Sequence, residues 1–369
     1  MNKVAITNFG NTKFSHDDIS IESCLLSSTK ALFEQNSNLS KNDIDAVLVA
    51  TNENKKYLSP ILSELSGIKP KISHTVENLC SSGTNAIVSA YSYIASGLAN
   101  VALVVGAERF DSPGQILEWD NSRGEYKHPI FWASIFTKSY KRRFGITDED
   151  LAIVSVKNHK NAKDNPNAYS NKTYTIEDVL NSRKLTDEIK ILDCSRPCTG
   201  SSAILLASED YVKKITDTPV WIAGIGQKTE SASFTKSNSF TDMASTKEAA
   251  RSAFENSKLQ PKNVNVAEIH DAFSVCEPMI LEDLGFVNKG GGLEYSKNLY
   301  NTDNRKINPR GGLIGAGHPL SATGVAQTIE ITQQLQGKAG KRQILDANIG
   351  LVHNMAAAAT SSTVLLLRS

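Results

Sequence analysis

Long apolar runs and an excess of one charge are both missing from this chain of 369 residues. No stretch approaches the ~18 consecutive apolar residues that a membrane-spanning helix needs. The opening residues, MNKVAITNFG, resemble a strand rather than a secretory signal. The 40 Lys and Arg residues are balanced by 39 Asp and Glu residues, which excludes a nucleic-acid-binding surface as the main function. We therefore expect a cytoplasmic protein with neither a membrane nor a nucleic acid as its partner.

Cysteine is also scarce, and its pattern excludes a disulfide framework. The five cysteines are scattered and odd in number, which favours reduced thiols. Cys194 and Cys198 have no second Cys or His pair close by in the sequence, so no metal site is predicted there. No Walker loop or GxGxxG turn opens a helix, so neither nucleotide hydrolysis nor NAD chemistry is implied.

Two pairs of segments resemble each other at a nearly equal offset. Residues 4–13 (VAITNFGNTK) resemble residues 220–229 (VWIAGIGQKT), and residues 39–50 (LSKNDIDAVLVA) resemble residues 259–270 (LQPKNVNVAEIH). In each half a small-residue turn then leads into a helix, and another strand follows. Any protein of alternating strands and helices produces some such echoes, but two matched segments favour a true duplication. The alternation itself predicts an α/β fold.

The duplication divides the chain into an N-terminal half, residues 1–215, and a C-terminal half, residues 216–369. A polar segment rich in Lys and Asn, at about residues 111–193, separates the matched parts. Such a segment is typical of an inserted loop domain that lies on the surface as a lid rather than in the core.

A cysteine precedes the helix expected at residues 83–97, within VENLCSSGTNA. At that position Cys80 would feel the positive end of the helix dipole, which lowers the pKa of a thiol. The small residues after it would let a thioester approach. The alternative is a buried structural cysteine at a tight turn.

The matching turn of the second half, NPRGGLIGAGHPLSATG at residues 308–324, contains His318 followed by Pro319. Proline suits the first turn of a helix, so His318 would stand where Cys80 stands in the first half. If the halves pack symmetrically, the two side chains converge as a Cys–His pair, which activates a thiol nucleophile. The alternative is a histidine that only hydrogen-bonds within its own Gly-rich turn.

Two further histidines follow expected strands. His270, in EIHDAFS, ends a strand and would lie at the crevice between the halves. His353 and Asn354, in GLVHNMAAAAT, precede a run of alanines that forms either a close-packed turn or the start of the last strand.

Together, CSSG at Cys80, HDAF at His270, the GHP of His318 and the HN of the last turn resemble the thiolase superfamily. The resemblance is strongest to its sterol-carrier-protein-like and archaeal acetoacetyl-CoA thiolases, and it runs along essentially the whole chain. It implies a five-layer αβαβα sandwich of two duplicated α/β halves with an inserted loop domain.

The resemblance also implies roles for these residues. Cys80 would be the nucleophile that accepts an acyl group, and His318 would deprotonate it. His270 stands where other thiolases carry an Asn that holds the thioester oxygen. The backbone N–H groups of Cys80 and Met355 would form a second oxyanion hole.

The chain departs from the family where most thiolases carry a second catalytic cysteine. His353 stands in that turn and is the first candidate for the proton transfer to and from the α-carbon, because imidazole titrates near neutral pH. Cys276 is the second candidate, although we expect it to face the core. Ala272 replaces the cysteine of the HDCF variant, and Ser321 replaces a usual glycine, where its hydroxymethyl group would narrow the pocket.

By this resemblance we expect an acetyl-CoA C-acetyltransferase that uses CoA thioesters as substrates and needs no metal or other cofactor. Alternatives are an acyltransferase with a non-CoA acceptor, or a non-catalytic subunit of a complex. A homodimer or homotetramer is expected, and a hydroxymethylglutaryl-CoA synthase and a zinc-ribbon/OB protein are possible partners. The insertion would hold CoA, and its basic residues are candidates for binding the phosphates. The alternative for any one of them is a solvated surface charge, and the sequence does not choose among Lys138, Lys141, Arg142, Arg143, Lys157, Lys160 and Lys163.

Overall fold

A computed structural model describes residues 2–35, 39–118, 124–233 and 239–369. Its strands are β1 (Val4–Asn11), β2 (Ala46–Ala50), β3 (Ile72–Val76), β4 (Val101–Glu108), β5 (Gly200–Ser208), β6 (Val220–Thr229), β7 (Val266–Glu268), β8 (Ile349–Ala356) and β9 (Ser361–Arg368). Its α-helices are α1 (Ile21–Glu34), α2 (Leu58–Ser66), α3 (Ser82–Ala95), α4 (Pro129–Phe144), α5 (Asp148–Ala162), α6 (Ile176–Leu180), α7 (Glu209–Ile215), α8 (Ala244–Ser257), α9 (Cys276–Asp283), α10 (Gly292–Asn301), α11 (Gly312–Ala316) and α12 (Leu320–Leu335).

The order of the strands repeats as a mirror image. The sheet runs β3-β2-β4-β5-β1-β6-β9-β8-β7, so β2-β4-β5-β1 in the first half corresponds to β7-β8-β9-β6 in the second. The halves meet where β1 pairs with β6 through only two residue pairs, Ala5 with Trp221 and Ile6 with Val220. The predicted duplication of α/β halves is therefore confirmed. The strands of the two halves form one sheet, which is joined at the edge where β1 meets β6.

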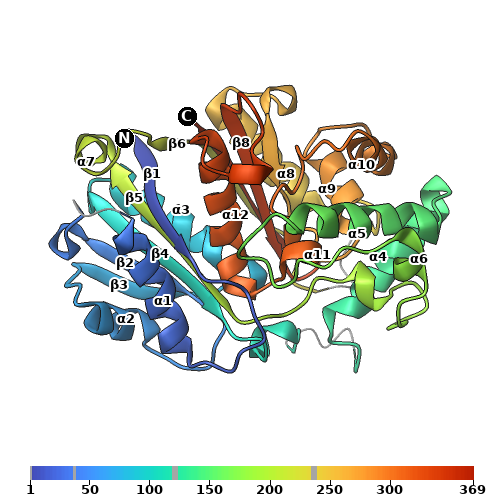
Figure 1. The fold of residues 1–369 in the computed structure, drawn as a ribbon, viewed down its shortest axis with the longest axis horizontal. Helices are drawn as coiled ribbons and strands as arrows, with labels where there is room; N and C mark the ends of the chain where they lie inside the picture. Colours follow the sequence, from blue (N-terminus) through green and yellow to red (C-terminus); the bar gives the residue numbers. More distant parts are fainter. Residues whose placement is uncertain (1, 36–38, 119–123, 234–238) are drawn as a thin grey trace.

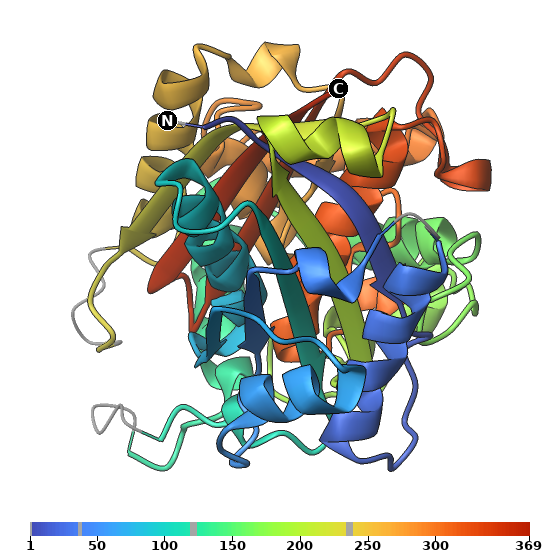
Figure 2. The same ribbon diagram turned by 90° about the vertical axis from the view of Figure 1, so that its left-hand side faces the viewer.

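Helices cover both faces of each half of the sheet, and the two halves share the central layer of helices. The fold therefore has five layers (Figure 1). Helices α1 and α2 cover the outer face of the first half, α8 and α9 cover that of the second, and α3 and α12 lie between the halves (Figure 2). Side chains alternate accordingly along β4: Leu103 packs on the outer helices, whereas Val104 packs on the central ones. The predicted five-layer sandwich is confirmed.

Glycines allow the two central helices to approach each other closely. A Cβ atom on Gly83 of α3 would lie 2.5 Å from the backbone oxygen of Ser321 on α12. A Cβ atom on Gly324 of α12 would lie 2.9 Å from the backbone nitrogen of Thr84 on α3. The small residue at position 83 therefore serves helix packing rather than substrate access, which corrects our interpretation of that position.

The inserted segment is only partly a surface feature. Lys157 and Asn158 on α5 are buried, and the Nζ atom of Lys157 lies 3.1 Å from Oε1 of Glu277. Helix α5 packs against α10 and α11 of the second half. The prediction of a surface lid is thus wrong for α5, because its polar residues satisfy one another inside the protein instead of facing water.

Within the described residues, none of the helices combines the length and the apolar character that crossing a membrane requires.

Candidate active site

A cavity of about 390 Å³ opens where the two halves and the insertion meet. Cys80, His270 and His318 line it, together with side chains that are mostly apolar. The apolar lining comes mainly from Leu79, Leu117, Ile130, Trp132, Leu185, Ile191, Ala272, Phe273, Leu320, Met355, Ala357 and Ala358. A concave apolar site with a few converging polar groups is the usual form of a small-molecule site.

The structure brings the predicted thiol and two of the three predicted histidines together. The Sγ atom of Cys80 and one ring nitrogen each of His270 and His318 all lie within 4.8 Å of one another. The two imidazole rings are perpendicular, with their centroids 5.2 Å apart. Thiolate and imidazole are also zinc ligands, so the same three atoms could hold a metal ion in place of a reacting thiol.

Cys80 lies in a 3-10 turn, Leu79–Ser81, that leads directly into α3. The preceding residue, Leu79, has a left-handed conformation with a φ of 47°, which costs a branched side chain about 1–2 kcal/mol. Its carbonyl oxygen accepts hydrogen bonds from Ser82 Oγ at 2.6 Å and Asn52 Nδ2 at 3.3 Å. These contacts hold the turn that presents the sulfur to the cavity.

The thiol is neutral at rest. Burial and, to a smaller extent, the nearby carboxyl group of Glu108 raise the pKa of Cys80 to about 12. This contradicts our expectation that the dipole of α3 lowers the pKa. Burial dominates because the helix dipole is worth only about 0.3–1 kcal/mol at exposed sites, whereas desolvation of a buried group can shift a pKa by several units.

His318 is held at the entrance to α12 by its backbone and its ring. Its N–H donates to the carbonyl oxygen of Arg196 at 2.8 Å, and its Nδ1 lies 2.7 Å from Thr323 Oγ1. The Thr323 hydroxyl donates to the carbonyl oxygen of Pro319 at 3.2 Å, so its oxygen accepts from Nδ1–H of His318. The lone pair of His318 is then on Nε2.

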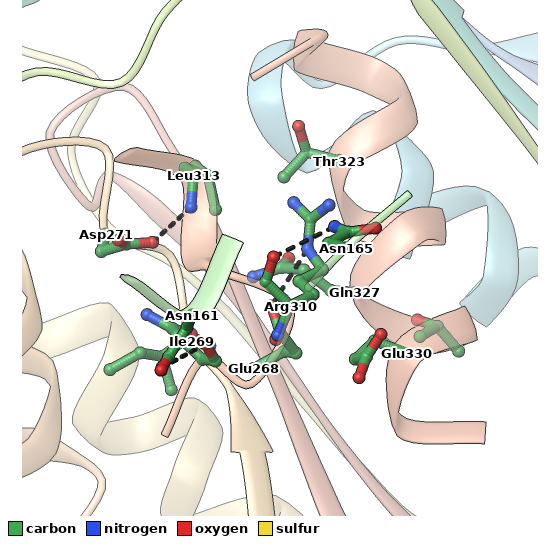
Figure 3. Close-up of polar contacts among 12 residues, drawn as sticks. Asn161, Asn165, Glu268, Ile269, Asp271, Arg310, Leu313, Thr323, Gln327 and Glu330 are labelled. Atoms are coloured by element: carbon green, nitrogen blue, oxygen red, sulfur yellow. Dashed lines mark hydrogen bonds and ion pairs between the residues drawn. The ribbon is translucent and has the colours of Figure 1, made fainter. Parts of the chain in front are cut away.

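The imidazole of His318 is also neutral. Burial lowers the pKa of His318 to about 3, and the positive charge of Arg310 contributes to the same shift. Arg310 is itself buried and paired with Glu268, with 3.1 Å between Nε and Oε2 (Figure 3). A neutral imidazole beside a neutral thiol can accept its proton when sulfur attacks a substrate.

His270 follows β7, and a buried carboxylate fixes the loop that carries it. Asp271 accepts a hydrogen bond from the backbone N–H of Leu313 at 2.6 Å (Figure 3). It accepts another from Asn158 Nδ2 at 2.7 Å. Asp271 thus ties the His270 loop to α11, which leads to His318, and to α5. Sequence reasoning overlooked this role, although Asp271 is part of the HDAF motif.

The structure places His353 away from the cavity. It belongs to β8, and its Nε2 lies 3.1 Å from Thr246 Oγ1 of α8, on the outer side of the sheet. Asn354, the next residue of the strand, points to the inner side. The side chain of His353 is therefore not positioned for the predicted proton transfer. Cys276 is buried at the start of α9, in the core as expected, and does not line the cavity.

The alanines after β8 form a turn rather than the start of β9. Ala357, Ala358 and Ala359 have left-handed φ angles of 43°, 62° and 58°. Met355 and the first two of these alanines line the cavity, so this turn forms part of its wall. The role of the Met355 N–H as an oxyanion donor stays a prediction.

Ser321 does not narrow the cavity as predicted, because its hydroxyl is turned towards a buried carboxylate. Its Oγ donates to Oε2 of Glu108 at 2.6 Å, and Asn52 Nδ2 donates to the same oxygen at 2.9 Å. Glu108, which sequence reasoning missed, therefore connects the end of β4 with the start of α12 beside Cys80.

The basic residues that we expected to bind CoA do not line the cavity. Several are paired elsewhere, as Lys141 is with Asp148 and Glu188. The cavity lining instead includes Arg196, together with Cys194 and two histidines, His16 and His128, none of which the sequence analysis assigned to the active site.

The chain resembles known proteins along most of its length. The family pattern "Thiolase, N-terminal domain" matches residues 3–176, and "Thiolase C-terminal domain-like" matches residues 226–369. The chain is 33% identical to an acetyl-CoA acetyltransferase of Methanothermobacter thermautotrophicus, over 96% of both chains. It is 34% identical to sterol carrier protein 2 of Bos taurus, over 76% of this chain and 56% of that one. A solved structure of an Ltp2-ChsH2(DUF35) aldolase shares the fold, with a TM-score of 0.86 and 22% identity over 100% of this chain and 98% of the other.

Proposed function

Because the chain belongs to the thiolase family, we propose that it is an acetyl-CoA C-acetyltransferase that condenses two acetyl-CoA molecules to acetoacetyl-CoA and CoA, or runs the reverse thiolysis. The thiolase domains and the similarity to acetyl-CoA acetyltransferases together support an acyltransferase. The single observation that carries the proposal is the meeting of Cys80 Sγ with the ring nitrogens of His270 and His318 within 4.8 Å.

In the first half-reaction, sulfur attacks the thioester carbonyl of acetyl-CoA while Nε2 of His318 takes the thiol proton of Cys80. The bond between carbon and the CoA sulfur then breaks, and the CoA thiolate takes that proton from His318. His270 donates a hydrogen bond to the carbonyl oxygen as negative charge develops. Such a donor is typically worth about 2.7–4 kcal/mol in the transition state.

In the second half-reaction a proton leaves the α-carbon of a second acetyl-CoA. We assign the removal of this proton to His318, which is neutral again after the first half-reaction. His318 lines the cavity, whereas His353 does not. The resulting carbanion attacks the acetyl group on Cys80, and the departing thiolate of Cys80 takes the proton back from His318. One histidine thus moves a proton at two sulfur atoms and one carbon atom.

The size of the cavity favours a second candidate function, the transfer of acyl groups larger than acetyl. About 390 Å³ of space walled by Trp132, Phe273 and Leu117 is more than an acetyl group fills. A bulky apolar acyl chain would bury its surface against these side chains. Transfer to a non-CoA acceptor is a further alternative. A non-catalytic subunit is disfavoured, because such a subunit has no need of the three converging groups.

We also propose that the protein acts in the cytoplasm as a homodimer or homotetramer. A hydroxymethylglutaryl-CoA synthase and a zinc-ribbon/OB protein are its proposed partners through family resemblance alone.

The test is thiolysis with a panel of 3-oxoacyl-CoA substrates. Purified protein is mixed with CoA and acetoacetyl-CoA, or with longer and branched homologues, and the acyl-CoA products are measured. Acetyl-CoA from acetoacetyl-CoA supports the first function, and a higher kcat/KM for bulky chains supports the second. Absence of any CoA-dependent cleavage across the panel would overturn both.

A further inference from the structure

We propose that Asn354 and Gln327 set the tautomer of His270, so that its Nε2 carries the proton and faces the cavity as a hydrogen-bond donor. These two are positioning residues, since neither lines the cavity. The consequence for catalysis rests on the proposed function, but the tautomer itself does not.

A relay of hydrogen bonds runs from the backbone of His353 through Gln327 and Asn354 to His270. It begins at a group that can only accept a hydrogen bond. The backbone carbonyl oxygen of His353 can only accept a hydrogen bond, and Gln327 Nε2 on α12 lies 3.3 Å from it. The amide of Gln327 is thereby oriented, and its Oε1 must serve as an acceptor. Asn354 Nδ2 lies 3.0 Å from that oxygen and donates to it.

The orientation then passes from Asn354 to the imidazole. With Nδ2 of Asn354 directed at Gln327, the second hydrogen of the same NH₂ group points to Nδ1 of His270, 2.9 Å away. Oδ1 of Asn354 lies on the other side, 3.2 Å from the hydroxyl of Thr84. Nδ1 of His270 must therefore be the acceptor.

A neutral imidazole has one acceptor nitrogen and one N–H, so accepting at Nδ1 places the proton on Nε2. Burial holds the pKa of His270 well below its usual value, which keeps the ring neutral. Gln327, Asn354 and His270 are all buried, so the relay is shielded from bulk water.

The two imidazoles that meet Cys80 thus have opposite tautomers. His318 keeps its proton on Nδ1, opposite Thr323, and offers a lone pair at Nε2. His270 offers a proton at Nε2. One ring is set up as a base and the other as a donor to the thioester oxygen. A zinc ion held by Cys80 and both Nε2 atoms would require His270 to give up this proton.

The test reads the tautomers directly by long-range ¹H–¹⁵N correlation spectra of protein labelled at histidine. His270→Gln identifies the His270 signals among the seven histidines. In the parent protein we expect an unprotonated Nδ1 and a protonated Nε2 for His270. Asn354→Asp should reverse the two, because a carboxylate accepts from Nδ1–H. Gln327→Leu frees the Asn354 amide to rotate and should give a mixture.

Thr323→Val is the matched control, since it removes the partner of His318 and should leave the His270 signals unchanged. A parent protein with Nδ1–H on His270 overturns the proposal, as does Asn354→Asp or Gln327→Leu with an unaltered tautomer. If Asn354→Asp does not fold, the parent spectrum alone decides.

Kinetics separate this proposal from the proposed function. For Asn354→Asp we expect kcat to fall by roughly 10²–10³-fold with KM close to that of the parent, because the lost donor acts mainly in the transition state. If the parent protein shows the expected tautomer but has no thiolase activity, the proposed function is wrong and the tautomer assignment is unaffected.

Discussion

The segments that lead into the N-termini of α3 and α12, which we call the helix entrances, occupy equivalent places in the two halves. They nevertheless supply different chemistry. Each helix lets the other approach at a glycine, Gly83 against Ser321 and Gly324 against Thr84. Ahead of α3, a 3-10 turn presents the sulfur of Cys80. Duplication of one helix entrance therefore provided two side chains that converge, and divergence made one of them a thiol and the other, His318 ahead of α12, an imidazole.

A side chain of opposite charge acts on each entrance. Glu108 lies near Cys80 and raises the pKa of the thiol, and Arg310 lies near His318 and lowers the pKa of the imidazole. Both effects add to those of burial, and both keep the pair uncharged. The comparison shows that the site does not store a thiolate. In the proposed mechanism the proton therefore moves as the substrate carbonyl accepts the electrons of the sulfur.

Removal of the imidazole at the α12 entrance should have the largest effect. His318→Ala should lower the rate of thiolysis by about 10²–10⁴-fold, because general base catalysis is lost. Exchange of the α-protons of acetyl-CoA with deuterated water, followed by mass spectrometry, should fall to a similar extent. Exchange that persists in His318→Ala would show that another group, such as Cys194, takes the α-proton.

Replacement of the donor between the entrances should have the next largest effect. His270→Ala should lower kcat by about 10²–10³-fold, the usual cost of a lost oxyanion donor. His270→Asn keeps an N–H near the same place and should recover part of the loss. Steady-state kinetics of the two variants make the comparison. Equal losses in both would mean that His270 does not act as a donor.

Substitution of the glycines where α3 and α12 meet should affect the free energy of unfolding more than the catalytic rate. Gly83→Ala and Gly324→Ala should each lower the free energy of unfolding by about 1–3 kcal/mol, because the new Cβ atoms meet the facing backbone. Gly291→Ala, whose Cβ would have its nearest neighbour at 3.2 Å, is a milder control. Urea denaturation measures all three. Variants at 83 and 324 as stable as the control would contradict the close approach of α3 and α12.

The smallest effect on activity is expected outside both entrances. His353→Gln should change turnover by less than about threefold, since the side chain lies on the outer side of the sheet. Its effect should be on acid stability. Burial lowers the pKa of His353 to about 3, against roughly 6.5 in the unfolded chain.

The sign of that effect follows from proton binding. Between pH 6.5 and 3 the unfolded chain binds the His353 proton and the folded protein does not, so stability is lost as the pH falls through this range. His353→Gln should therefore flatten the decline of the free energy of unfolding with acid. A large loss of turnover in this variant, with α-proton exchange abolished, would restore His353 to the proton-transfer role.

Cys80 and His318 could be found from the sequence because duplication repeats a register that local patterns reveal. The side of the sheet to which His353 points could not be predicted. Neighbouring residues of a strand point to opposite sides, and no nearby pattern indicates which side meets the cavity. Asp271, Glu108 and the polar face of α5 were missed for another reason. Buried carboxylates and amides have the same letters as surface residues, and only the fold shows that they satisfy one another.

The most direct test of the central claim is to find the acyl group. Protein incubated with labelled acetyl-CoA is digested at low pH, and the peptides are mapped by mass spectrometry, with Cys80→Ala as the control. We predict label on the peptide that contains Cys80 in the parent protein and none in the variant, together with loss of turnover in the variant. Turnover that survives in Cys80→Ala, or label only on another residue, would contradict the assignment of Cys80 as the nucleophile.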